Sequence, residues 1–161
     1  MKNLLIAIIV TAFAAVSCEK SEVLDNSANG RWLHDYEAAK KQAKEESKPI
    51  LINFTGTDWC GWCIKIEKEI FSKEEFKTYA KENLILMEVD FPKKKENKAK
   101  QTAEVKAQNK KLDKEFKIEG YPTIFLIDAE GKKLSEDIGY REGGAQAYVD
   151  HLKELLSKKK E

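Results

Sequence analysis

The chain of 161 residues is long enough for one domain with a substantial core and a short extension. Charged side chains make up 35% of it, but the 29 basic and 28 acidic ones nearly cancel, so no net charge favours nucleic acid or an anionic surface. Hydrophobic residues make up 42%, and aromatic and β-branched residues are frequent from Arg31 onward, which excludes a wholly disordered chain.

The N-terminus has the layout of an export signal. Lys2 precedes an apolar run over residues 4–16, which is too short to cross a bilayer as a helix. Small residues then lead into Cys18 in the order Ala-Val-Ser-Cys, which resembles the lipobox of bacterial lipoproteins, where the cysteine is lipidated. Cleavage by ordinary signal peptidase, which would release a soluble protein, is the alternative.

The cysteine count favours the lipoprotein interpretation. Cys60 and Cys63 form a close pair, so Cys18 is left over, and an exposed spare thiol is a liability in an exported protein. We therefore expect residues 1–17 to be a signal peptide and Cys18 to be the lipidated mature N-terminus. Residues 18–30 would be a flexible polar tether and residues 31–161 the folded domain.

Within the domain, apolar periodicity predicts alternating helices and buried strands. In the first half we expect a helix from Trp32 to the stop at Pro49, a strand over 50–54 and a helix from the cysteine pair to about 71. A capping box at Ser72–Glu75 would open the next helix, which runs to 82 and is followed by a strand over 84–89. The second half should contain a hairpin with strands over 124–127 and 133–138 and a final helix over 146–157.

The stretch over residues 91–117 carries ten lysines against four acidic residues. One interpretation is a basic arm that binds a partner; the other is a solvated helix whose apolar residues, Leu112 and Phe116, come late. We favour the second, because the basic residues are not interleaved with exposed aromatic ones, and we expect no binding of nucleic acid.

The residues Trp59-Cys60-Gly61-Trp62-Cys63 carry the chemistry. They follow a buried strand and open a helix, whose free N–H groups and positive dipole end stabilise a thiolate. We expect the pKa of the leading thiol to fall below the free value of about 8.5. Cys60 would then be the exposed nucleophile and Cys63, one turn later, the resolving thiol.

Other uses of a Cys-x-x-Cys pair fit less well. No second pair exists to complete a zinc site, and His34 and His151 are not at ligand spacing. Attachment of a c-type haem needs histidine at position 64, which is isoleucine. A purely structural disulfide stays open as an alternative. We expect neither a metal nor an organic cofactor.

The element order, the Trp59-to-Cys63 motif and the later Tyr121-Pro122-Thr123 together resemble the thioredoxin superfamily over about residues 31–158. The opening around Trp32 and the residues that lead into Cys60 are similar to exported bacterial thioredoxin-like proteins and to the C-terminal domain of the thiol:disulfide interchange protein DsbD. The resemblance implies an α/β fold with a central mixed sheet flanked by helices, the cysteine pair at a helix N-terminus and a cis-proline loop.

The resemblance also implies roles for neighbouring residues. A cis peptide bond would bring Pro122 against the two sulfurs, and the backbone of Tyr121 would pair with an extended substrate segment. Trp59, Trp62 and Tyr121 would form an apolar rim around that contact.

Departures from the thioredoxin pattern affect proton transfer. Thioredoxins bury an aspartate on the strand before the active loop, where it accepts the proton of the resolving thiol; the matching residue here is Asn53, which cannot. Glu67, one turn after Cys63, is a possible substitute. The motif also lacks the proline of thioredoxins and the histidine of disulfide isomerases between its cysteines. The connection between Asp90 and Pro122 is longer than usual, so we expect an extended helix there.

We therefore expect an exported thiol–disulfide oxidoreductase in the bacterial periplasm, held at the membrane by its lipid. Without a histidine between the cysteines to stabilise the thiolate, a reductase or isomerase is favoured over a strong oxidant. Its partners would be protein thiols and disulfides and a membrane or periplasmic redox donor. The alternative is a thioredoxin-fold binding, chaperone or assembly protein whose disulfide is inert.

Overall fold

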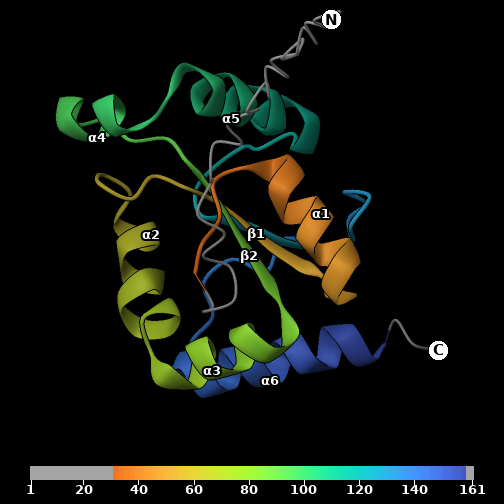
Figure 1. Cartoon of the computed structure of the whole chain (residues 1–161). Coiled ribbons are helices and arrows are strands. Elements are labelled where there is room, and N and C mark those ends of the chain that lie inside the picture. Colours follow the sequence, from red (N-terminus) through yellow and green to blue (C-terminus); the bar gives the residue numbers. More distant parts are fainter. Residues whose placement is uncertain (1–30, 159–161) are drawn as a thin grey trace, which may run out of the picture.

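The computed structural model describes residues 31–158 and shows a mixed sheet between two layers of helices (Figure 1). Strand β1 (Ile50–Thr55) lies at the centre of a sheet with the order β2-β1-β3. It pairs in parallel with β2 (Ile85–Asp90) and antiparallel with β3 (Thr123–Ile127). The predicted α/β thioredoxin-like fold with a mixed central sheet is confirmed. The expected lipidation site, Cys18, lies outside the described residues.

Helices cover both faces of the sheet. On one side lie α1 (Tyr36–Glu46) and α5 (Ala103–Phe116); Figure 1 shows α5 at the top of the molecule and α1 at its right. The short α4 (Lys95–Lys100) precedes α5 and has no buried residue. The other face is covered by four helical segments. They are α2 (Gly61–Ile66), the π-helical segment η2 (Glu67–Phe71) that continues it, α3 (Glu74–Asn83) and α6 (Gly144–Ser157).

The alternation of side chains along the strands divides the core into two clusters. On β1, Ile50, Ile52 and Phe54 pack toward α1 and α5. Leu51, which points the other way, packs with Ile66 and the rest of the cluster under η2, α3 and α6. Every residue of β1 is buried, as expected for a central strand that is covered on both faces.

Two predicted helix starts need correction. The first helix begins at Tyr36 rather than Trp32, because Asp35 has extended backbone angles and its carboxylate accepts the Ala38 N–H at 3.0 Å. The capping box at Ser72 does not form. Ser72 still has helical angles and its hydroxyl donates to the Lys68 carbonyl, so it closes the preceding helix and α3 starts at Glu74.

The hairpin strand predicted over 133–138 is also wrong in part. Leu134 N–H and Ile138 N–H donate to β3 carbonyls, so the segment does lie beside β3. The β3 N–H groups of Leu126 and Ile124, however, donate to the side-chain oxygens of Ser135 and Asp137 instead of to backbone carbonyls. The segment is therefore irregular, with a single bridge at Lys133.

The basic stretch forms two helices where one was predicted. Thr102 separates them, since its side chain accepts the Val105 N–H and starts α5. Leu112 and Phe116 are buried in the core, which confirms the solvated-helix interpretation for α5. Among residues 31–158 no helix is long and apolar enough to span a membrane.

Candidate active site

The two cysteines form a disulfide at the start of α2. Cys60 is the N-cap residue, with extended backbone angles, and its sulfur accepts the Cys63 N–H at 3.2 Å. Cys60 was expected to be exposed, but only 7% of its surface is accessible, against 3% for Cys63. The reason is that the Cys60 sulfur lies 3.4 Å from the Tyr121 carbonyl oxygen, under the loop that precedes β3.

The Tyr121–Pro122 peptide bond is cis and lies on this loop. The Tyr121 ring meets Trp59 edge-on at 5.9 Å between centroids, and its hydroxyl donates to Asp113 on α5 at 3.0 Å. Burial, with Asp113 as hydrogen-bond partner, raises the pKa of Tyr121 to about 12. The structure therefore brings together Cys60, Trp59, Tyr121 and Pro122.

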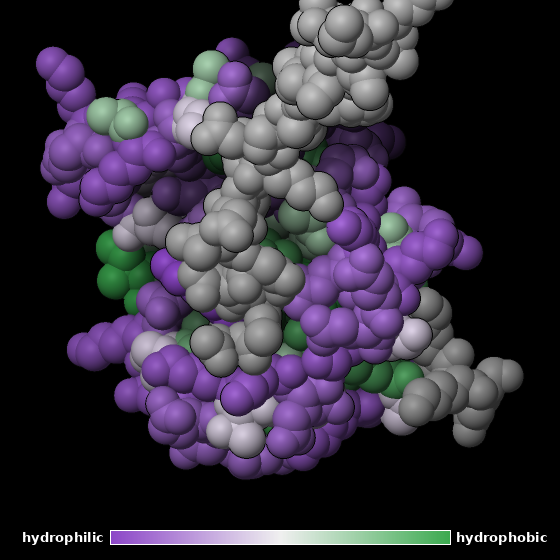
Figure 2. All heavy atoms as spheres, in the orientation of Figure 1, coloured by the Kyte–Doolittle hydropathy of each residue, from purple (hydrophilic) through white to green (hydrophobic). Residues whose placement is uncertain are grey.

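Trp62 lies between the two cysteines in the sequence and is 58% exposed. Its ring is 5.5 Å from that of Tyr140, and the Lys65 ammonium lies within 5 Å of both ring centroids. Figure 2 shows hydrophobic atoms at the surface beside α2, where Ile64 is also exposed. Exposed apolar side chains next to a disulfide are suited to contact with another chain.

The active loop is anchored by a network that the sequence analysis missed. The Asp58 carboxylate accepts the N–H groups of Lys93 and Lys94 at 2.9 and 3.0 Å and the Asn97 side-chain amide at 3.0 Å. Partial desolvation acts to raise the pKa of Asp58, but these hydrogen bonds outweigh it and hold that pKa below its usual value. The network joins the loop before Cys60 to the start of α4.

Trp59 is held by the same neighbouring segment. Its indole N–H donates to the Phe91 carbonyl at 2.8 Å, and the Lys93 ammonium lies 3.5 Å from the ring centroid. Gly56 makes this position possible, because a Cβ there would come within 2.5 Å of the indole ring. The long connection after Asp90 thus supports the cysteine motif.

Asn53, the residue matched in sequence to the buried aspartate of thioredoxins, lies on β1. It is 4% exposed, and its side-chain oxygen has no hydrogen-bond partner within residues 31–158. Glu67 is an exposed residue one turn after Cys63; desolvation raises its pKa, opposed by Lys77. The structure adds a residue that was not predicted, Glu88, which is the register partner of Asn53 on β2.

The pKa of the Glu88 carboxyl group is strongly shifted from its ordinary value. Burial raises its pKa to about 7, and the nearby charges of Asp90 and Glu67 contribute to the shift. In the sequence, Glu88 is the single acidic residue of the otherwise apolar strand predicted over 84–89. This pattern does not show which residues surround Glu88 in the folded protein.

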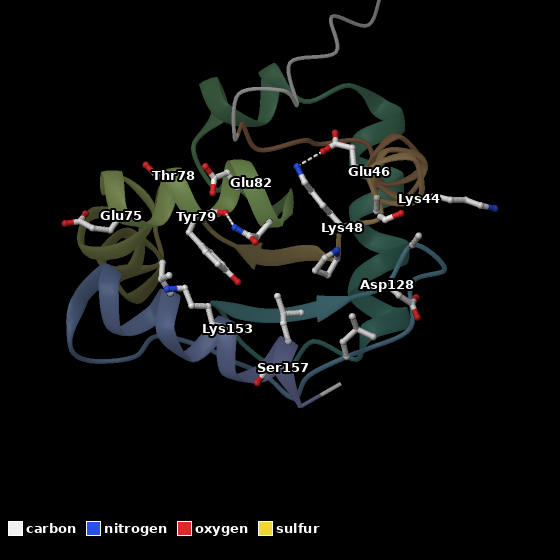
Figure 3. A pocket seen from close by; sticks show the side chains of 18 of the residues that line it. Lys44, Glu46, Lys48, Glu75, Thr78, Tyr79, Glu82, Asp128, Lys153 and Ser157 are labelled. Atoms are coloured by element: carbon white, nitrogen blue, oxygen red, sulfur yellow. Dashed lines mark hydrogen bonds and ion pairs between the residues drawn. The ribbon is translucent and has the colours of Figure 1, made fainter. Parts of the chain in front are cut away.

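A broad groove lies elsewhere on the molecule, between the C-terminal end of α1, α3, α6 and the turn after β3 (Figure 3). Its walls carry charges of both signs, and Lys48 forms an ion pair with Glu46 at 2.7 Å. Neither cysteine of the pair and no rim residue lines this groove. Within the described part of the chain, no three His, Cys, Asp or Glu side chains are grouped to hold a metal.

Comparison with known proteins agrees with this geometry. The thioredoxin-like domain family matches residues 36–154 of the chain. The chain belongs to the thioredoxin-like family. The expected membership of the thioredoxin superfamily is thus confirmed.

Three comparisons show that this thioredoxin-like chain is similar to bacterial Dsb proteins. It is 41% identical over 130 residues to the disulfide bond reductase DsbH of Chlamydia pneumoniae, covering 81% of the chain and 75% of that protein. A solved structure of a DsbH oxidoreductase superposes with a TM-score of 0.72 at 40% identity, covering 79% of this chain and 84% of the other. The expected relation to DsbD is also found. A DsbD of Pseudoalteromonas atlantica is 28% identical over 127 residues, which span 77% of this chain but only 19% of that protein.

Proposed function

We propose that this protein is a thiol–disulfide oxidoreductase that reduces disulfides of exported proteins. The observation that carries the proposal is the Cys60–Cys63 disulfide at the start of α2, in contact with the Tyr121–Pro122 loop. The similarity to a protein named disulfide bond reductase supports the direction of the reaction.

In the proposed reaction, the thiolate of Cys60 attacks a substrate disulfide. A bond forms between Cys60 and one substrate sulfur, and the other substrate sulfur leaves and takes up a proton. Cys63 then loses its proton and attacks the Cys60 sulfur. The Cys60–Cys63 disulfide forms, the second substrate sulfur leaves as a thiol, and two electrons have passed to the substrate. An external dithiol donor in the envelope restores the reduced pair.

The surfaces around the pair fit this reaction. The rings of Trp59 and Tyr121 contact each other next to the disulfide, and the exposed Trp62 adds to this apolar rim. An extended substrate segment would pair with the backbone near Pro122, which places its cysteine over Cys60. The rim residues supply apolar contact that does not depend on one substrate sequence.

Equilibration with mixtures of reduced and oxidised glutathione tests the proposal. We expect the Cys60–Cys63 pair to titrate between its dithiol and disulfide forms toward the reducing end of the range of about −270 to −120 mV covered by this superfamily. The fraction of each form is read by thiol alkylation and mass measurement. A disulfide that stays oxidised throughout would instead support a binding or assembly protein with an inert bridge.

We further propose that the protein is exported to the periplasm and anchored through a lipid on Cys18. The support is the signal-like residues 1–17 and the cysteine that follows them. In fractionated bacterial cells, wild type should sediment with membranes, whereas Cys18→Ser should move to the soluble periplasmic fraction. Equal solubility of the two forms would contradict lipidation, while leaving the redox proposal untouched.

A further inference from the structure

Asn53 and Glu88 lie side by side in the sheet, on the face that α2 and η2 help to cover. They are register partners on the parallel strands β1 and β2. Leu51 and Leu86, two residues before each of them, belong to the core cluster under η2, α3 and α6. Because side chains two apart on a strand share a face, Asn53 and Glu88 point to the same side.

The two side chains complement each other as hydrogen-bonding groups. The buried Asn53 oxygen lacks a donor within residues 31–158, and an acceptor left in that state costs free energy. The Glu88 side chain is only 20% exposed, and with a pKa of about 7 it carries a proton much of the time at neutral pH. A protonated carboxyl can donate its O–H to an amide oxygen, which the ionised form cannot do.

The charges that face Glu88 favour proton uptake. Glu67 on η2 and Asp90 on β2 are both negative and both raise its pKa. His34 also lies near it: its Nδ1 is 3.7 Å from a Glu88 oxygen, and its side chain is largely exposed. Glu67 lies one turn after Cys63, so the cluster reaches the helix that carries the resolving thiol.

We propose that Glu88, with Asn53 as its hydrogen-bond acceptor, takes the proton from Cys63 when the mixed disulfide is resolved. The inference rests on the proposed function. The Cys63 S–H bond breaks and the proton passes to the Glu88 carboxylate, directly or through one water. The Cys63 thiolate then attacks Cys60, the Cys60–Cys63 bond forms, and the Cys60–substrate bond breaks with its electron pair on the substrate sulfur. Glu88 afterwards returns its proton to solvent.

In thioredoxins, a single buried aspartate lies beneath the resolving thiol and accepts its proton. In this protein, two residues would share that function. Here the carboxyl is on the neighbouring strand, and Asn53 keeps the central position as a neutral acceptor for the protonated form. The arrangement explains both the unpartnered Asn53 oxygen and a partly buried acidic residue within β2.

A chromogenic aromatic disulfide separates attack from resolution. Reduced protein releases one aromatic thiolate when Cys60 attacks and a second when Cys63 resolves the mixed disulfide. In wild type, the second phase should accelerate with pH through about 7, where Glu88 becomes the base form. In Glu88→Gln that phase should be about 10²-fold slower at pH 7, the lower end of the usual range for general acid–base catalysis. Its rate should then rise only toward the thiol pKa, near 8.5 in the absence of perturbation.

Two further variants show whether the carboxyl or merely the structure matters. Asn53→Asp in the Glu88→Gln background should restore fast resolution at pH 7, because it returns a carboxyl to the site. Glu82→Gln, an exposed glutamate on α3 outside this cluster, should behave as wild type in both phases. A second phase that is unchanged in Glu88→Gln, or slowed with the wild-type pH profile, would overturn the proposal. A wild-type protein with no first phase would contradict the proposed function itself.

Discussion

Replacing Cys63 with alanine should convert the protein into a trap for its substrates, whereas replacing Cys60 should abolish the reaction. Cys60 is the N-cap residue of α2, with its sulfur beside the Tyr121 carbonyl where a substrate segment would bind. Cys63 is one turn deeper and more buried, so it reaches only the Cys60 sulfur. Without Cys63 the Cys60–substrate disulfide has no internal partner to break it. Turnover should fall to the uncatalysed level in both variants.

Non-reducing electrophoresis and mass spectrometry after acid quenching would measure the trapped species. Mixed disulfides should accumulate with Cys63→Ala and be missing with Cys60→Ala. Both variants are best made in a Cys18→Ser background, which removes the third thiol as a source of adventitious pairing. Trapping that occurs only with Cys60→Ala would reverse the assignment of the two cysteines.

The central part of the fold could be predicted because local patterns there agree with the tertiary structure. The run over 50–54 is too apolar to lie anywhere but in the core, and β1 is indeed the middle strand. The cysteine motif lies between a strand and the start of a helix, and this position favours a reactive thiol pair over the other uses of a Cys-x-x-Cys motif. The Tyr121-Pro122 pair supplied the second part of the pattern, far away in sequence but adjacent to Cys60 in space.

The failures come from interactions between side chains and backbone that no periodicity reveals. Ser72 has the right spacing for a capping box, but its own backbone angles are helical and its hydroxyl donates to the Lys68 carbonyl, so it caps the end of the preceding helix instead. The strand after Gly131 has suitable residues, but Ser135 and Asp137 take the place of backbone acceptors. Whether a side-chain oxygen takes the place of a backbone acceptor depends on which atoms come into contact after folding, and a sequence pattern does not show this.

The site residues that could not be predicted were missed for the same reason, because their contacts form only in the folded protein. Asp58 looks like an ordinary loop residue until the start of α4 folds against it and supplies three donors. Glu88 is separated from Asn53 by 35 positions, and only the parallel register of β1 and β2 makes them neighbours. The absence of the buried aspartate was visible at Asn53, but the group proposed to replace it was not.

The second large effect expected concerns stability. Glu88→Gln should stabilise the oxidised protein by about 3 kcal/mol at pH 8 and leave it nearly unchanged at pH 4. The folded protein holds the Glu88 pKa at about 7, above its ordinary value of 4.5. Between these values the folded state keeps a proton that the unfolded state has lost, so stability falls as pH rises through this window. A shift of this size corresponds to about 3 kcal/mol at 1.36 kcal/mol per pKa unit.

Urea unfolding of the disulfide form at several pH values would measure this difference between variant and wild type. The gain should appear between pH 4.5 and 7 and then become constant, because above the folded pKa both states of the wild-type chain are ionised at this position. Glutamine keeps the size of the side chain and a donor for the Asn53 oxygen, so packing should change little. Glu82→Gln provides the matched control, with no pH-dependent gain expected. A gain in Glu88→Gln that is the same at every pH would show that Glu88 does not titrate in this window, and with it the chemical basis for proton transfer from Cys63 would be lost.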